Sequence, residues 1–125
     1  MRIRILCNEL QITGTLDDTP SARLLWDALP FTSTANTWGQ EVYFSAPVSM
    51  PLDAAPKVVV PPGTICFWVQ GSALALPFGP TPVSEHGECR LITAVNTLGH
   101  IDGDPRILAN ISEGDSITVE RAELP

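Results

Sequence analysis

Residues 36–44, with the sequence NTWGQEVYF, concentrate polar and aromatic side chains in one short segment of this 125-residue chain. Together with the segment before them, from Phe31 onward, they predict a strand, a turn at Trp38-Gly39 and a second strand ending at Phe44. Glycine suits such a turn because it adopts backbone conformations that other residues avoid. The stretch therefore predicts a β-hairpin-like unit in the middle of the fold.

The second strand of this unit has two different faces. Side chains alternate along a strand, so Glu41 and Tyr43 share one side while Val42 and Phe44 share the other. A carboxylate beside a phenol can hydrogen-bond a ligand or act as a general base. The same pair can also be structural, at the rim of a barrel, with Asn36 and Gly39 serving the turn.

Two strands and a helix precede this unit. Apolar and polar residues alternate over residues 3–7 and 10–16, which predicts half-buried strands joined by a tight turn at Asn8. A helix is expected next, capped by Asp18 or Thr19 with Pro20 in its first turn, and stopped by Pro30. Its apolar face consists of Ala22, Leu25, Trp26 and Leu29, with Trp26 as the expected anchor against the sheet.

The remaining sequence predicts more short strands separated by turns. Prolines at positions 47, 51 and 56 mark a loop, and strands are expected at residues 65–69, 73–76, 91–95 and 116–120. A short helical turn is expected over residues 104–110, with Asp104 as its cap and Pro105 at its first position. This pattern predicts a mostly β protein, a closed barrel or sandwich, with residues 1–125 forming one domain.

Charge and cysteine content restrict the classes of function. The net charge is −7, which disfavours nucleic acid and anionic membrane surfaces as partners. Such an acidic surface is compatible with a cationic ligand, although it ordinarily serves solubility. Three cysteines without CxxC spacing do not predict a disulfide framework. The N-terminus lacks the features of a signal peptide and no stretch is long enough to span a membrane, so we expect a cytoplasmic protein.

Three ordered blocks resemble the uncharacterised cyclophilin-like family of bacteria and archaea, a domain of unknown function. The first block is residues 36–44. The second comprises Phe67-Trp68, residues 71–74 (GSAL) and residues 78–84 (FGPTPVS), and the third is residues 94–99 (AVNTLG). The order and spacing of these blocks, with the opening hairpin and the helix, extend the resemblance over nearly the whole chain.

The resemblance implies an eight-stranded cyclophilin-like β-barrel with a main helix covering an open end. It implies no established activity. True cyclophilins place an arginine beside a phenylalanine and a histidine in a proline-binding groove, and no comparable segment occurs here. The arginines are at positions 2, 4, 23, 90, 106 and 121. Peptidyl-prolyl isomerase activity is therefore disfavoured, because a fold alone does not carry a function.

Aromatic and polar residues of the three blocks are candidates for a ligand pocket, since such pockets combine aromatic walls with a few polar groups. Trp68 and Phe78 could form walls, and the hydroxyls of Thr81 and Ser84 could bind a ligand or cap the adjacent turn. Asn96 follows an expected strand, so its amide could reach the barrel mouth or bond the loop backbone. The candidate ligand-binding residues are Asn36, Trp38, Glu41, Tyr43, Trp68, Phe78, Thr81 and Asn96.

No metal site or cofactor is expected. Residues 85–89 (EHGEC) contain metal-capable groups, but they lack the separated pairs of a structural zinc site. His100 is isolated from His86, and neither phosphate-binding nor nucleophile-elbow motifs occur.

Three hypotheses of function follow. The first is a module that binds a small molecule or a peptide in a polar and aromatic pocket. The second is an enzyme acting on a small metabolite, with Glu41 as the general base and Tyr43 or Asn96 orienting the substrate. The third, disfavoured hypothesis is prolyl isomerisation. The sequence leaves the oligomeric state open.

Overall fold

A computed structural model describes residues 1–122 of the chain. Its elements are β1 (Arg2–Cys7), β2 (Leu10–Leu16), α1 (Pro20–Asp27), β3 (Phe31–Thr34), β4 (Asn36–Thr37), β5 (Glu41–Ser45), β6 (Lys57–Val60), β7 (Thr64–Trp68), β8 (Ala73–Pro77), β9 (Cys89–Ile101), the 3-10 helix η1 (Pro105–Asn110) and β10 (Ser116–Arg121).

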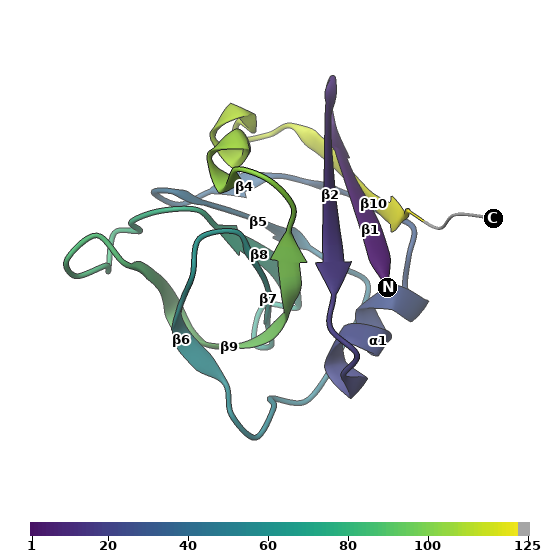
Figure 1. The fold of residues 1–125 in the computed structure, drawn as a ribbon, viewed down its shortest axis with the longest axis horizontal. Helices are drawn as coiled ribbons and strands as arrows, with labels where there is room; N and C mark the ends of the chain where they lie inside the picture. The colour runs from purple at the N-terminus through teal and green to yellow at the C-terminus, as the bar shows by residue number, and fades with distance from the viewer. Residues whose placement is uncertain (123–125) are drawn as a thin grey trace.

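The strands form a nearly closed barrel (Figure 1). Antiparallel pairing runs in the order β3-β10-β1-β2-β9-β7-β8-β5-β4. The two ends of this path, β3 and β4, are separated in the chain only by buried Ala35, so they form one interrupted strand that pairs with β10 on one side and β5 on the other. Counted this way, eight strands surround the core, which is the architecture that the resemblance to the cyclophilin-like family implied.

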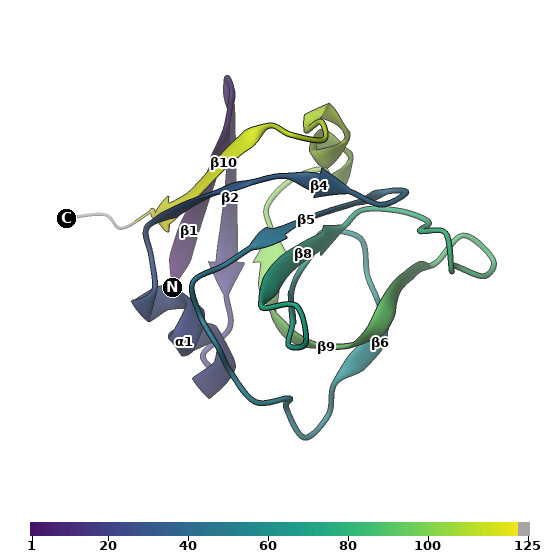
Figure 2. The ribbon, with the colours of Figure 1, turned by 180° about the vertical axis from the view of Figure 1, so that it is seen from behind.

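The short helices also follow the sequence. Helix α1 is capped by Thr19, whose side chain accepts a hydrogen bond from the backbone N–H of Ala22. It lies at one end of the barrel beside the N-terminus, and η1 lies near the opposite end (Figures 1 and 2). Asp104 caps η1 in the same way by accepting from the backbone N–H of Arg106. No helix within residues 1–122 has the length and apolar character needed to cross a membrane.

The expectation that Trp26 anchors α1 is confirmed in part, because its side chain packs against the main core without being fully buried. Trp26 is only partly buried, and the side chains that α1 buries are Ser21, Ala22 and Leu25. The guanidinium of Arg121 lies over the Trp26 ring, with its central carbon 4.5 Å from the ring centroid. The tryptophan therefore covers the barrel edge at the end of β10, while the smaller residues enter the core.

Strand β9 determines where a site can form. Its second half pairs with β7 and β2 inside the barrel wall, whereas its first half pairs with β6. Figure 2 shows the curved path of β9 around the barrel, with β6 beside its first half. The first half of β9 and β6 thus form a second layer outside β5, β8 and β7, and they enclose a second apolar cluster.

Candidate functional site

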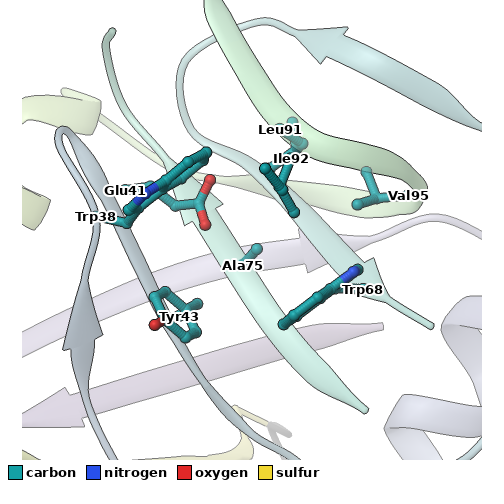
Figure 3. Close-up of a pocket in the computed structure, with 8 residues that line it drawn as sticks. All are labelled: Trp38, Glu41, Tyr43, Trp68, Ala75, Leu91, Ile92 and Val95. Carbon is teal, nitrogen blue, oxygen red and sulfur yellow. The ribbon is translucent and has the colours of Figure 1, made fainter. Parts of the chain in front are cut away.

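A cavity of about 200 Å³ lies on the outer face of β5, β8 and β7, beneath the first half of β9. Figure 3 shows its lining, with the indole of Trp38 beside the carboxyl group of Glu41 and the rings of Tyr43 and Trp68 further along the cavity. The lining residues are Trp38, Glu41, Tyr43, Trp68, Ala75, Leu91, Ile92 and Val95. The arrangement is an aromatic and aliphatic enclosure with one carboxyl group.

The turn before β5 positions Trp38. The backbone N–H of Trp38 donates to the carbonyl of Glu41 over 3.0 Å, which closes the turn. Gly39 has a φ of +59°, and a Cβ there would lie 2.9 Å from Cα of Thr81 and from Cδ of Pro82. Only glycine fits this conformation and this close approach, so the turn packs on the loop after β8 and holds Trp38 over the cavity.

Glu41 is the acidic group of the cavity. Its side chain is only 6 % exposed, and its Oε1 is shielded from solvent without a hydrogen-bond partner among residues 1–122. Burial raises the pKa of Glu41 from 4.5 to about 7, because removing the carboxylate from water disfavours its charged form. The group is therefore poised to change its protonation state near neutral pH.

Trp68 supplies a second unpartnered polar atom. Its indole Nε1 is buried and has no acceptor among the described residues. The opposite edge of the ring packs closely on the turn after β7, where a Cβ at Gly71 would lie 2.3 Å from Cε3 of Trp68. Across residues 1–122, three buried side-chain nitrogen or oxygen atoms lack a partner, and two of them, Glu41 Oε1 and Trp68 Nε1, belong to this cavity.

Two thiols lie close to the carboxyl group, in the apolar cluster that the cavity borders. Cys66 and Cys89 are both buried and free. Burial raises the pKa of each thiol, and the nearby negative charge of Glu41 raises it further. Both are therefore neutral thiols at physiological pH, and they add apolar surface beside the cavity.

Four of the predicted ligand-binding residues meet at this cavity: Trp38, Glu41, Tyr43 and Trp68. The ring of Tyr43 faces the enclosure while its hydroxyl points away from the centre (Figure 3). The other four, Asn36, Phe78, Thr81 and Asn96, do not line it.

For Asn96 the structure confirms one of the two alternatives, a side chain that bonds loop backbone, but the expected strand-end position is wrong. It lies inside the thirteen-residue β9, not at a strand end, because β9 continues past it to pair with β7 and β2. It is fully buried, its Oδ1 accepts from the backbone N–H of Asp53 over 2.7 Å, and its Nδ2 donates to the carbonyl of Pro51 over 2.9 Å. Its amide thus clamps the loop between β5 and β6.

The remaining predicted polar residues also bond the backbone. Thr81 Oγ1 donates to the carbonyl of Arg90, and Ser84 Oγ accepts from the backbone N–H of both Thr81 and Arg90, which ties the loop after β8 to the start of β9. Asn36 Nδ2 donates to the carbonyl of Tyr43 across β4 and β5. Phe78 lies at a separate surface hollow beside Arg106.

The apolar half of the lining was not predicted from the sequence; it consists of Ala75, Leu91, Ile92 and Val95. A signal was present, because residues 73–77 form an apolar run without polar alternation, and all five residues of β8 are buried. A strand of this kind is covered on both faces. The run could have indicated that a second layer lies outside the barrel at β8.

Basic side chains are not part of the lining, and its one metal-capable group is the carboxyl of Glu41. The eight lining residues include no lysine, arginine or histidine. Within residues 1–122, no group of three or more histidine, cysteine, aspartate or glutamate side chains is arranged to hold a metal ion.

The fold and the cavity together define a class: a nearly closed, cyclophilin-like β-barrel with an acidic and aromatic cavity on its outer face. The family described as Cyclophilin-like matches residues 1–120, and the chain belongs to this family. Its barrel is similar to the solution structure of the hypothetical protein AF2241 from Archaeoglobus fulgidus, with a TM-score of 0.81 and 36 % sequence identity over 98 % of this chain and 95 % of that one. A search of the curated proteins finds no significant match.

Proposed function

We propose that the protein binds a small molecule in the cavity beneath β9. The observation that carries this proposal is the pair of buried, unpartnered polar atoms, Glu41 Oε1 and Trp68 Nε1, at one apolar cavity. A buried polar atom without a partner costs about 1–3 kcal/mol of folding free energy. A ligand that supplies the missing hydrogen bonds recovers that free energy on binding. The bound state is then lower in free energy than the empty site.

The volume limits the size of the ligand. A cavity of about 150 Å³ accommodates benzene, so a cavity of about 200 Å³ suits one ring with a short substituent or a single amino-acid side chain. In this proposal Trp38, Tyr43 and Trp68 form the walls, and Glu41 orients the ligand. The ligand does not contact the other four candidate residues, which lie outside the cavity: Asn36, Phe78, Thr81 and Asn96.

A cavity-filling variant tests the proposal. The wild-type protein, Ala75→Leu and a control with the same change at exposed Ala54 are screened against a library of small metabolites and short peptides by thermal shift. A ligand present at 100 times its Kd stabilises the native state by about 2.7 kcal/mol. We expect a ligand that stabilises the wild type and Ala54→Leu but not Ala75→Leu, whose larger side chain fills the cavity.

Two results would contradict the proposal. One is a complete library without a stabilising compound. The other is a set of ligands that stabilise Ala75→Leu as well as the wild type, which would place their binding elsewhere.

A second candidate function is general-base catalysis by Glu41. A base with a pKa of about 7 in a cavity is matched to proton abstraction at neutral pH. The amide of Asn96 is bonded to the loop before β6, so Tyr43 is the remaining candidate for orienting a substrate, through its ring and not its outward-pointing hydroxyl. Incubation of the bound compounds in D₂O tests this function: deuterium incorporation that depends on Glu41 supports it, and no incorporation into any bound compound rejects it.

A further inference from the structure

We propose that the ligand of this cavity is a small organic ammonium ion with at least one N–H group, held by Glu41 and by the faces of Trp38, Tyr43 and Trp68. This inference rests on the ligand-binding function proposed above and names the chemical class of the ligand. Three observations lead to it: an uncompensated acid, an aromatic enclosure and an acceptor atom without a donor.

The first observation is the missing counter-charge. Among the described residues, the arginines that form ion pairs do so with Asp18, Glu85, Glu88, Asp102, Asp104 and Glu120, and Glu41 belongs to no ion pair. No basic side chain lines the cavity. A buried carboxylate requires a positive partner to stay charged. A cationic ligand supplies that partner, and the net charge of −7 favours its approach.

The second observation is the aromatic enclosure. Three electron-rich rings, from Trp38, Tyr43 and Trp68, line the same cavity as the carboxyl group of Glu41, with Trp38 beside that group in Figure 3. Ring faces attract cations, and the attraction grows when water is excluded. An anionic ligand would be repelled by both the rings and Glu41, so the enclosure selects against anions.

The third observation distinguishes between kinds of ammonium. Glu41 Oε1 is buried and accepts no hydrogen bond within residues 1–122. A primary, secondary or tertiary ammonium donates an N–H to this oxygen, and a charge-assisted bond of this kind contributes about 1.5–3 kcal/mol. A quaternary ammonium has no N–H and leaves the oxygen without a partner.

Glu41 is the group whose protonation responds to such a ligand. The other titratable side chains facing this region are Tyr43 from β5, Cys66 from β7 and Cys89 from β9. Burial raises the pKa of both thiols, so they stay neutral near pH 7. An ammonium ion favours the charged form of Glu41 and lowers its pKa, so binding near pH 7 releases a proton to solvent.

The test compares three probes of similar shape: benzylamine, benzyl alcohol and benzyltrimethylammonium. Each is titrated at pH 7.5 into the wild type, Glu41→Gln and the control Glu9→Gln, which changes an exposed glutamate, and binding is followed by NMR shifts. We expect the wild type and Glu9→Gln to bind benzylamine at least about tenfold more tightly than either other probe. Glu41→Gln is expected to lose this preference.

Calorimetry of the wild type provides a measurement that does not depend on a variant. Benzylamine binding in two buffers of different ionisation enthalpy is expected to show net proton release at pH 7. No proton release would overturn the inference, whatever the stability of Glu41→Gln.

The other outcomes separate this inference from the function on which it rests. Equal binding of benzyl alcohol, or library ligands that are all neutral or anionic, would overturn the ammonium assignment and leave the ligand-binding function standing. Equal binding of benzyltrimethylammonium would overturn the N–H requirement. Failure of every probe and every library compound would reject both.

Discussion

The two faces of β5, β8 and β7 differ in how completely they are packed, although they belong to the same strands. The inner face contributes Phe44, Leu74 and Phe67 to the main core, each fully buried in a continuous apolar cluster. The outer face contributes Glu41, Tyr43 and Trp68 to an incompletely filled cavity with unpartnered polar atoms.

Because side chains alternate along a strand, adjacent residues fall on opposite sides of this division. Phe67 and Trp68 are neighbours in β7, yet one is fully buried and the other borders the cavity. We therefore expect that stability and the proposed ligand binding can be changed separately by substituting residues one position apart.

The largest difference is expected between these two neighbours. Phe67→Ala leaves a hole in the packed core and should lower the free energy of unfolding by about 3–5 kcal/mol. Trp68→Ala should cost less than half of that, since the indole is partly exposed and already borders empty volume. Urea unfolding followed by circular dichroism measures both, with Phe67→Leu as a milder core variant. Equal losses from the two alanine variants would show that the outer face is part of the structural core.

The next effect is a pH dependence that originates from Glu41. Its pKa is about 7 when folded and 4.5 ordinarily, so between these values the folded state binds more protons than the unfolded state. Stability must therefore fall as the pH rises from 4.5 to 7, by on the order of 3 kcal/mol in total, and level off above.

Glu41→Gln should remove this dependence, and the control Glu9→Gln should retain it. The measurement is the free energy of unfolding of the three proteins at pH 4 and at pH 8. A wild type and Glu41→Gln with parallel pH profiles would show that the carboxyl group is not desolvated.

A smaller effect on stability is expected at the turn that supports Trp68. Gly71→Ala places a Cβ where the indole edge now lies, but the ring can swing toward the cavity, so we expect a loss of about 1 kcal/mol. The displaced ring should occupy the cavity and weaken ligand binding much more than it weakens folding. A stability loss as large as that of Phe67→Ala, with binding unchanged, would mean that the ring is fixed and the backbone moved.

The smallest expected effect is on prolyl isomerisation. The cavity has no arginine, and the chain has no segment like the proline-binding groove of true cyclophilins. A proline-peptide assay should therefore give the uncatalysed rate at every concentration of protein. Acceleration that is lost in Ala75→Leu would assign isomerase activity to the outer face.

Local features of the fold were predictable from the sequence because their causes lie within a few residues. The opening hairpin at Asn8, the cap of α1 at Thr19 and the cap of η1 at Asp104 each depend on adjacent backbone and side-chain chemistry. The pattern of Glu41 and Tyr43 on one side of β5 was predictable for the same reason.

Features that depend on long-range pairing were not predictable in the same way. Strand β6 was not expected, because its four residues follow a proline-marked loop and pair with β9 alone. The length of β9 was underestimated, since polar Asn96 and Thr97 directly follow the strand expected at residues 91–95. The place of Asn96 in the middle of this strand, away from the cavity, follows from that underestimate.

The position of β10 in the sheet has a consequence for synthesis of the protein. This last strand pairs with both β1 and β3, and it completes the ring at the interrupted strand β3-β4. During translation, β1 and β3 each keep one unpaired edge until residues 116–121 have left the ribosome and can pair with both. Non-local pairing of this kind slows folding. Nascent chains stopped before β10 should therefore remain sensitive to proteases, even though all eight residues that line the cavity have already been made.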